Sequence, residues 1–280
     1  MQRPLVIYHG GCSDGFGAAY ALYARFCRGG ECSCDFVAGV HGQPPPDVSG
    51  REVHIVDFSY KRPVLEQICR SARSVLIIDH HISAERNLQG LEREYDNLQV
   101  IFDMNKSGAV LAWEHYHSTP PPRLLLHIQD RDLWRFQMEG TNDIHAALVS
   151  RPFDFRDWEK LCAGDEALEP LLKEGRAINR YRWRMIELHR EKAVMATISG
   201  YRVPLVNCYE DIMSDLVGEL AEGQPFAAGY QDQGTIRKWS LRSREGGIDV
   251  SEIASRLGGG GHRNAAGFNT NLPEELLVIP

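Results

Sequence analysis

The sharpest chemical feature of the sequence is Asp79-His80-His81, a carboxylate followed by two imidazoles. These residues follow the apolar run 74–78, and groups at the end of a buried strand can bind a divalent cation without leaving the scaffold. Taken alone, the tripeptide is equally well explained as loop residues that make ordinary hydrogen bonds. Other residues therefore have to decide between a metal site and a simple loop.

Four more residues with oxygen or imidazole ligands follow apolar runs or lie in the loops after them: His9, Asp14, Asp57 and Asp130. A mixed set of histidine and aspartate suits Mn²⁺ or Mg²⁺ better than structural zinc, which favours thiolates. Two such ions, sharing a bridging carboxylate, would clamp a phosphate and activate a water molecule for attack on phosphorus. The pattern therefore predicts a two-metal hydrolytic site.

A second chemical feature is the glycine run 258–261, followed by His262 and Arg263. Backbone without side chains lets amide groups approach a phosphate closely, and the two cationic or donor side chains add to that attraction. A flexible turn is the alternative explanation. We favour phosphate binding, because the run lies between an amphipathic helix expected at 250–257 and a helix expected to begin at Ala265.

Two isolated positions could also meet an anion. Arg242, at the end of an expected strand, carries a planar fork of donors, although a solvated surface arginine is the commoner explanation for a single residue. Ser107 and Gly108 open an expected helix at 107–117, whose first amides could bind an anion. Equally, Ser107 could simply cap that helix.

The elements that must position these residues alternate between strand and helix. Apolar runs at 4–8, 53–56 and 74–78 predict strands, and helices are expected at 17–26 and 63–71. This alternation predicts an α/β fold with a parallel sheet. Ligands of such sheets gather beyond the carboxyl ends of the strands, where His9, Asp57 and Asp79 would converge.

Three segments are expected along the chain. A metal-binding domain at 1–135 closes after an apolar strand at 124–129, and a helical connector follows at 136–195. A smaller α+β domain then occupies 196–280. Its short apolar runs predict strands at 196–199, 203–207, 226–231 and 238–242, with helices at 211–221 and 250–257.

Composition limits the class of partner. The formal net charge is -7 and the pI is near 5.9, which disfavours binding of long duplex nucleic acid but allows a small anionic substrate in a local pocket. Seven scattered cysteines do not suggest a disulfide framework, and Cys27, Cys32 and Cys34 are expected to be free thiols in a reducing cytoplasm. No stretch of about 18 apolar residues predicts a membrane span.

The ordered motifs resemble those of the DHH phosphoesterase superfamily over nearly the whole chain. The matching positions are His9 to Gly15, Asp57, Asp79 to His81, Asp130 and the loop 258–268, which resembles the DHH-associated C-terminal domain. The resemblance implies that five residues bind metal, with Asp57 as the bridge: His9, Asp14, Asp57, His80 and Asp130. It also implies that Asp79 and His81 orient ligands or assist proton transfer.

The resemblance further implies a set of residues that contact the phosphate or the nucleotide at the scissile side: Arg242, Gly260, Gly261 and His262, with Asn264 as a weaker candidate. One position departs from the family pattern. The first motif usually supplies two aspartates, whereas here Cys12 and Ser13 precede the single carboxylate of Asp14. One metal site is therefore expected to be weaker or differently filled. Whether Cys12 replaces an aspartate ligand or only packs stays open.

Together these features predict a Mn²⁺-dependent phosphoesterase, with Mg²⁺ or Co²⁺ as alternative ions, that cleaves phosphodiester bonds of short oligonucleotides or cyclic dinucleotides. One alternative is a phosphomonoesterase or exopolyphosphatase that acts on phosphoadenosine-phosphate or polyphosphate. Another is a nucleotide sensor that binds without hydrolysis. The sequence leaves open whether the chain forms a homodimer.

Overall fold

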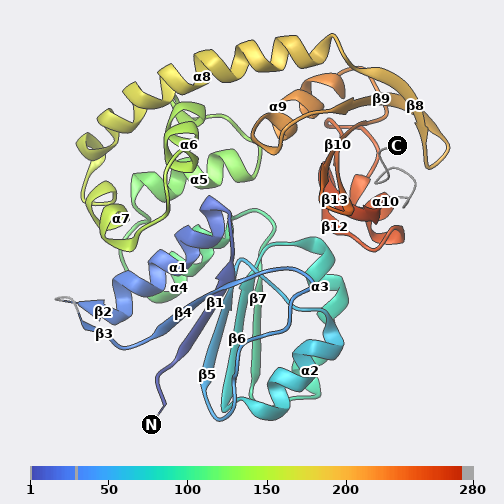
Figure 1. Cartoon of the computed structure of the whole chain (residues 1–280). Coiled ribbons are helices and arrows are strands. Elements are labelled where there is room, and N and C mark those ends of the chain that lie inside the picture. Colours follow the sequence, from blue (N-terminus) through green and yellow to red (C-terminus); the bar gives the residue numbers. More distant parts are fainter. Residues whose placement is uncertain (1, 29–30, 273–280) are drawn as a thin grey trace. The chain divides into compact units, whose positions relative to one another are not determined.

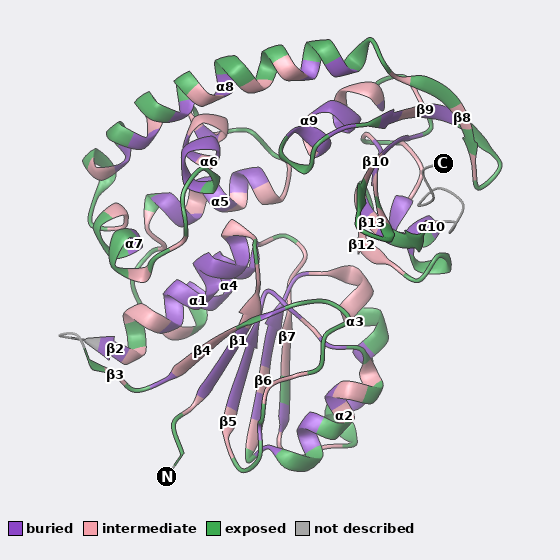
Figure 2. Cartoon of the chain, in the orientation of Figure 1, coloured by how far each residue is buried: buried purple, intermediate pink, exposed green. Residues whose placement is uncertain are grey.

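The structure is a computed structural model that describes residues 2–28 and 31–272. The chain divides into two compact units, Met1–Asn179 and Arg180–Pro280. Each unit has its own sheet and its own buried apolar residues (Figures 1 and 2). Residues 273–280, which end the predicted C-terminal domain, lie outside the described residues.

The first unit is built on a five-stranded sheet in which every neighbouring pair is parallel, in the order β4-β1-β5-β6-β7. Its strands are β1 (Leu5–His9), β4 (Asp35–Gly39), β5 (Glu52–Val56), β6 (Ser74–Asp79) and β7 (Leu98–Phe102). The strands expected at 4–8, 53–56 and 74–78 are confirmed as β1, β5 and β6. Apart from His54 in β5 they are apolar runs, because both faces of a parallel sheet are covered.

Helices cover the two faces of this sheet (Figure 1). Alternate residues of β1 enter different cores: Val6 packs with one group of helices, whereas Leu5 and Ile7 pack with the other. The first group comprises α1 (Ser13–Phe26), α4 (Gly108–Tyr116), α5 (Arg123–Asp132), α6 (Thr141–Val149) and α7 (Phe155–Leu161). The second comprises α2 (Arg62–Ser71) and α3 (Ile82–Leu88), with a short 3-10 turn η1 (Leu91–Arg93). The predicted α/β architecture is confirmed.

The apolar run 124–129 is helical, so the strand expected there was wrong. It forms most of α5, whose buried positions include Leu124, Leu125 and Ile128. That spacing matches one face of a helix, whereas a strand would bury every second residue. The change matters for the site, because it alters the direction in which the acidic residues at the end of this segment point.

The segment 136–195, expected to be a helical connector, divides between the units. α6, α7, a 3-10 turn η2 (Asp165–Leu168) and the part of α8 (Glu169–Arg190) up to Asn179 belong to the first unit. Trp158 and Leu171 from this segment pack in the same core as α1 and α4. Residues 136–179 therefore complete the first unit's core.

The cysteines near residue 30 differ from the prediction. Cys27 and Cys32 face each other across the short pair of strands β2 (Cys27–Arg28) and β3 (Glu31–Cys32), and a disulfide joins them. The expectation of free thiols was wrong for these two residues, because the hairpin brings them side by side. It is confirmed for Cys34, which is a free and buried thiol.

The second unit contains a six-stranded sheet in the order β12-β13-β11-β10-β9-β8. Its strands are β8 (Val194–Ile198), β9 (Tyr201–Asn207), β10 (Ala227–Gln233), β11 (Ile236–Arg242), β12 (Gly260–His262) and β13 (Ala265–Asn271). Leu216 of α9 (Glu210–Leu220) packs with Ala227, and Ile253 of α10 (Val250–Arg256) packs with Leu241. The expected α+β character of this region is confirmed.

The segment that follows the glycine run is a strand, so the helix expected to begin at Ala265 was wrong. β13 pairs antiparallel with both β12 and β11. Ala266 and Phe268 are buried with α10, and the residues on either side of each are more exposed. That alternation is the period of a strand with one covered face.

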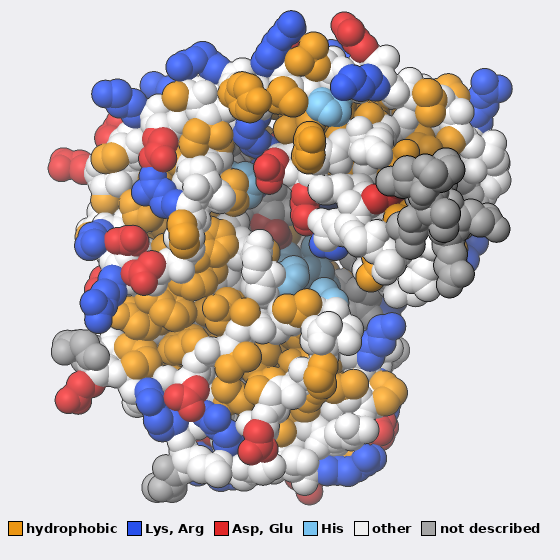
Figure 3. Space-filling model, in the orientation of Figure 1, with side chains coloured by type: hydrophobic (Ala, Val, Ile, Leu, Met, Phe, Trp, Pro, Cys, Tyr) orange, Lys and Arg blue, Asp and Glu red, His pale blue; other side chains and the backbone are white. Residues whose placement is uncertain are grey.

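The surface agrees with the charge argument made from composition. On the face drawn in Figure 3, Lys and Arg side chains are interspersed with Asp and Glu. This distribution fits the formal net charge of -7 and offers no broad basic stripe on that face. Within residues 2–28 and 31–272, no helix is long and apolar enough to cross a bilayer.

Candidate metal centre and substrate-binding face

Three neighbouring strands of the first unit end in residues that could bind metal. β1 ends at His9, Asp57 follows β5 directly, and β6 ends at Asp79. Tyr8 of β1 pairs with Val56 of β5, and Val56 pairs in turn with Ile78 of β6, the residue before Asp79. The parallel register therefore delivers the three side chains to one edge of the sheet, as the sequence predicted.

Asp57 lies at the centre of the first group of possible ligands. Its Oδ1 is 3.1 Å from His80 Nε2, and its Oδ2 is 3.5 Å from His9 Nδ1. Cys12 Sγ lies 3.6 Å from the same Oδ2. The two carboxylate oxygens thus face different histidines, which is the arrangement a bridging ligand requires.

The backbone at Asp57 is strained and closely packed. Its φ of 51° is in the left-handed region, which is uncommon for residues other than glycine. Gly108, at the start of α4, lies against it, and a Cβ at Gly108 would be 2.4 Å from the Asp57 Cβ. Strain of this kind persists only where the surroundings enforce it, and it clusters at functional sites.

His80 is surrounded by carboxylates. Besides the contact with Asp57, its Nε2 lies 3.5 Å from Asp14 Oδ2 and 3.5 Å from Asp132 Oδ2. His80, Asp14 and Asp57 are each about 1% exposed. So much like charge in so small a volume is costly unless a cation or a proton offsets it.

Asp14 is held by the beginning of α4. Its Oδ2 accepts a hydrogen bond from Gly108 N at 2.7 Å, and its Oδ1 accepts one from Ala109 N at 3.1 Å. Ser107 caps the same helix, because its Oγ accepts from Val110 N. Both explanations weighed for Ser107 and Gly108 are therefore realised, and the anion at the helix terminus is Asp14 itself.

The carboxylate of Asp79 binds groups of three neighbouring residues. Its Oδ1 is 2.6 Å from His81 Nδ1 and accepts a hydrogen bond from His80 N at 2.7 Å. Its Oδ2 accepts from Ser59 Oγ at 2.8 Å. Because the carboxylate is completely buried and engaged on both oxygens, it fixes the orientation of the His81 ring.

The pKa values reflect a surplus of negative charge. Burial raises the pKa of Asp14 well above its ordinary value, and the charges of Asp57 and Asp132 raise it further. Burial also opposes ionisation of Asp57, but hydrogen bonds with His80 and His9 outweigh it and hold that pKa well below the ordinary range. Burial lowers the pKa of His80, yet the surrounding carboxylates raise it to about 10. The carboxylates around His80 thus favour a positive charge at this position.

Asp130, predicted as a metal ligand, lies elsewhere. Its Oδ1 accepts a hydrogen bond from Gln137 N at 2.8 Å, and its Oδ2 accepts from Met138 N and Thr141 Oγ1. The carboxylate that reaches His80 belongs to Asp132. Sequence reasoning placed Asp130 after a strand, but in helix α5 the two aspartates point in different directions. The sequence shows both aspartates but carries no signal that distinguishes Asp132 from Asp130.

The donor set fits divalent cations. Among the described residues of the first unit, three groups have ligand atoms within 4.8 Å of one another: Asp57, Asp79, His80 and His81; His9, Cys12 and Asp57; and Asp14, His80 and Asp132. Within the described part of the chain, Asp132 Oδ2 is buried and accepts no hydrogen bond. A buried oxygen of this kind among carboxylates and imidazoles suits Mn²⁺ or Mg²⁺.

Cys12 lies two residues before Asp14, beside the cluster. Its Sγ accepts a hydrogen bond from Gly15 N at 3.2 Å and caps α1. Burial raises the pKa of this thiol well above its ordinary value, and the charges of Asp57 and Asp14 raise it further. Without a cation nearby the thiol is therefore neutral, and its contacts are those of a cap beside the cluster.

The second unit brings Arg242 and His262 to one face of its sheet. Arg242 is in register with Ala265 of β13, which pairs with His262 of β12. Residues in register across neighbouring strands point to the same face. Because Arg242 Nη2 donates to Ser214 Oγ of α9 at 2.7 Å, this is the face that α9 partly covers.

The glycines of β12 allow strands to approach closely. A Cβ at Gly261 would lie 2.5 Å from Ala265 O, and Gly260 pairs with Gly267. Asn264 is exposed, and its Oδ1 accepts a hydrogen bond from the Ser243 hydroxyl. By register Gly260, Ala265 and Gly267 lie on the same sheet face as Arg242, so the surface beside its side chain consists of residues with little or no side chain.

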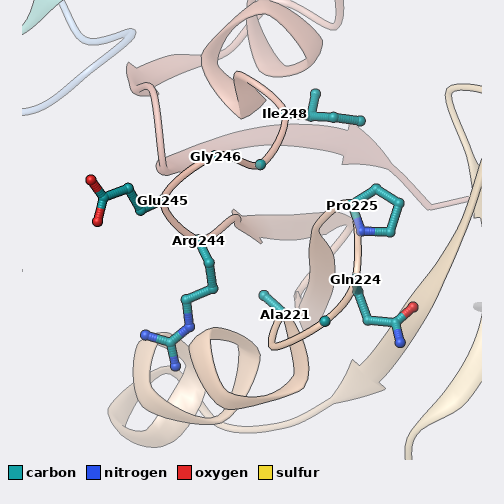
Figure 4. Close-up of a pocket in the computed structure, with 9 residues that line it drawn as sticks. Ala221, Gln224, Pro225, Arg244, Glu245, Gly246 and Ile248 are labelled. Atoms are coloured by element: carbon teal, nitrogen blue, oxygen red, sulfur yellow. The ribbon is translucent and has the colours of Figure 1, made fainter.

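A pocket in the second unit lies elsewhere, between the loop after α9 and the loop after β11 (Figure 4). Gln224, Pro225 and Ile248 line it, and Arg244 contributes a guanidinium while Glu245 points away in this view. The predicted substrate residues, all within the described part of the chain, are not among its lining residues. We therefore keep this pocket separate from the candidate site.

Residues 205–277 match the family model of the DHHA1 domain. The chain is 29% identical over 291 residues to an uncharacterized protein of Acanthamoeba polyphaga mimivirus, with 95% of this chain and 67% of that protein covered. It is 28% identical over 238 residues to oligoribonuclease NrnB of Bacillus subtilis (strain 168), with 76% of this chain and 57% of that protein covered. The chain thus spans only part of the length of these relatives.

Two solved structures share the fold. The DHH domain of a member of the s1p family of ribosomal proteins has a TM-score of 0.64 at 14% identity, covering 99% of this chain and 85% of that one. The pGpG-specific phosphodiesterase PggH from Vibrio cholerae has a TM-score of 0.52 at 16% identity, covering 98% and 95%. The second unit thus matches the DHHA1 domain model, and the chain shares its fold with a solved DHH domain.

Proposed function

We propose that this protein is a divalent-metal phosphodiesterase that hydrolyses short oligonucleotides or linear and cyclic dinucleotides. The observation that carries the proposal is the buried cluster in which Asp57 presents one oxygen to His80 and the other to His9. The names of two relatives, an oligoribonuclease and a pGpG-specific phosphodiesterase, support a small nucleotide substrate. The net charge of -7 supports it too, because a long polyanion would be repelled.

The geometry suggests how two cations, which we propose to be Mn²⁺, would be held. One site would draw on His9 and Asp57 Oδ2, the other on Asp57 Oδ1, His80 and the two carboxylates near it. Those two carboxylates are Asp14 and Asp132. A pair of bound ions would neutralise the scissile phosphate and lower the pKa of an attacking water. His80 would then bind as a neutral ring and release the proton that it holds in their place.

The chain's own residues would orient groups and transfer a proton. Asp79 Oδ1 lies 2.6 Å from His81 Nδ1 and fixes the orientation of that ring, and the His81 side chain is 23% exposed. Burial lowers the pKa of His81, but the charge and hydrogen bond of Asp79 together with the charge of Asp57 raise it to about 9, so the ring can donate a proton. As the bond from phosphorus to the leaving oxygen breaks, His81 would protonate that oxygen.

We assign the second unit to holding the rest of the substrate. Arg242 and His262 lie on one sheet face, and the neighbouring positions on that face are glycine and alanine. A guanidinium fork suits a phosphate, and a bare backbone allows close approach to it. Gly260 and Gly261 are proposed to contact the phosphate through their backbone, and Asn264 is proposed to contact the substrate from the same loop.

A substrate panel tests the proposal. Purified protein would receive Mn²⁺ and one of five substrates: a 5′-phosphorylated dinucleotide, a short oligoribonucleotide, a cyclic dinucleotide, 3′-phosphoadenosine 5′-phosphate or polyphosphate. We expect turnover of one or more of the first three, and its loss in His80→Ala. Turnover confined to the last two would point to a phosphomonoesterase or polyphosphatase. No turnover on any member would favour the sensor alternative.

A further inference from the structure

The loop after α5 holds two aromatic residues in an unfavourable backbone conformation. Trp134 has a φ of 56° and Phe136 a φ of 52°. Bulky side chains rarely occupy this left-handed region, so two instances within three residues require an explanation. Strain of this kind is maintained where the position of a side chain matters for function.

Asp130 enforces the conformation of this loop. Its backbone oxygen accepts hydrogen bonds from Arg135 N at 2.9 Å and from Phe136 N at 3.3 Å. Its carboxylate accepts from Gln137 N and Met138 N, as described above. One buried residue therefore holds four consecutive amides of the loop, those of residues 135–138, and the backbone wraps around it as a turn.

The two rings are packed against each other and against a cation. Their centroids are 4.9 Å apart at an interplanar angle of 78°. The Arg131 guanidinium lies 4.5 Å from the Trp134 ring and 5.2 Å from the Phe136 ring. Yet Phe136 is 36% exposed and Trp134 is only half-buried. The strain therefore does not serve to bury the rings in the core.

The loop that carries the two rings begins close to the candidate metal centre. α5 ends at Asp132, whose carboxylate lies 3.5 Å from His80 Nε2. The chain turns directly after it, because Trp134 N donates to Arg131 O at 3.0 Å. An aromatic surface is thus fixed two residues beyond a carboxylate of the cluster, on the same turn.

We propose that Trp134 and Phe136 form a stacking platform for a nucleobase next to the scissile phosphate. The inference rests on the proposed function and adds to it a base-binding subsite in the first unit. Base stacking on aromatic rings tolerates any base, and the guanidinium beneath the rings adds attraction for an anionic nucleotide. Purines, which offer the larger stacking surface, are the preferred occupants.

Kinetics with a matched pair of substrates tests the platform. Trp134→Ala and Phe136→Ala would be assayed with a 5′-phosphorylated purine dinucleotide and with its abasic analogue, which keeps the sugars and the scissile phosphate. We expect Trp134→Ala to lower kcat/KM about 5- to 150-fold on the dinucleotide. Turnover of the abasic analogue should stay within about twofold, and Trp134→Phe should restore much of the lost activity. Trp183→Ala, which removes an exposed tryptophan of α8, is the control.

The outcomes separate this inference from the proposed function. An equal loss on both substrates, or no loss on either, would overturn the platform even if the wild type is an active phosphodiesterase. If the wild type is inactive, quenching of tryptophan fluorescence by added dinucleotide decides the matter. Quenching that disappears in Trp134→Phe but persists in Trp183→Phe supports the platform, and quenching unaffected by Trp134→Phe refutes it.

Discussion

Exchanging the two aspartates at the end of α5, one at a time, for asparagine should have opposite consequences. Asp130→Asn is expected to lower stability and to leave Mn²⁺ binding at the cluster largely intact. Asp132→Asn is expected to leave stability unchanged or slightly raised and to weaken Mn²⁺ binding. The two residues are only two positions apart, and asparagine has nearly the shape of aspartate, so each variant serves as the control for the other.

The magnitudes follow from the contacts of each carboxylate. Asp130 accepts three hydrogen bonds, and an amide oxygen can replace only part of that set. Losing one or two bonds to a buried charged group costs about 2–5 kcal/mol in the free energy of unfolding. In a unit of this size that loss lowers Tm by roughly 4–20 °C.

Asp132 behaves differently because its surroundings oppose its charge. Burial raises its pKa and the charge of His80 only partly offsets this, while Asp57 raises it further, so the metal-free fold gains from removing the charge. Within the described residues Asp132 Oδ2 accepts no hydrogen bond that asparagine would break. Loss of a direct ligand should weaken Mn²⁺ binding at least about tenfold, since even supporting partners of ligands cost that much.

Thermal denaturation in chelator and calorimetric titration of Mn²⁺ would measure both quantities on the same preparations. If Asp130→Asn abolished Mn²⁺ binding at unchanged Tm, while Asp132→Asn bound Mn²⁺ normally, the assignment of the two carboxylates would be reversed. Equal effects of both variants on both quantities would also refute the reasoning, because it gives them separate roles.

Three further predictions concern the same chain. Burial lowers the pKa of His81, but Asp79 and Asp57 together raise it to about 9, so protonation stabilises the metal-free fold fully below about pH 6.5. That stabilisation is lost as the pH rises through 9, and denaturation in chelator should show a decline that is flatter in His81→Gln. Gly108→Ala would drive a methyl group into Asp57 and should lower kcat/KM about 100-fold, whereas Gly164→Ala, with open space around it, should change activity less than about twofold. Arg242→Lys should raise KM roughly tenfold through loss of the guanidinium fork, with Mn²⁺ affinity unchanged in the titration.

The sequence was sufficient to predict the strands that carry the site. β1, β5 and β6 are largely apolar runs, each followed by a polar residue, so their existence and their shared edge could be inferred together. β4 was not identified, because at the edge of the sheet it is only partly buried and reads Asp-Phe-Val-Ala-Gly. An edge strand has a neighbouring strand on one side only and is less buried, so its sequence is less apolar.

The choice between Asp130 and Asp132 could not be made from the sequence. The run before them, Leu-Leu-Leu-His-Ile, is too short and too apolar for its period to distinguish strand from helix. Once it is helical, two residues separated by one position point about 200° apart around the axis. Only the packing of α5 determines which carboxylate meets His80.

The glycine run shows the same limit at the other end of the chain. Glycine carries no side chain whose periodicity could indicate the next element, and Ala265-Ala266 has high helical propensity. Tertiary pairing with β11 overrides that propensity and makes β13. The positions of Arg242 and His262 on one sheet face depend on this pairing and could not be read from the motif.

Metal stoichiometry and turnover measured on the same samples test the central claim most directly. After dialysis against Mn²⁺, the account predicts two ions bound per wild-type chain and hydrolysis of a 5′-phosphorylated dinucleotide that chelator abolishes. Asp57→Asn should bind fewer ions and lose turnover, because Asp57 presents an oxygen to each site. Turnover that survives in chelator, or two ions bound by Asp57→Asn at wild-type affinity, would contradict the account.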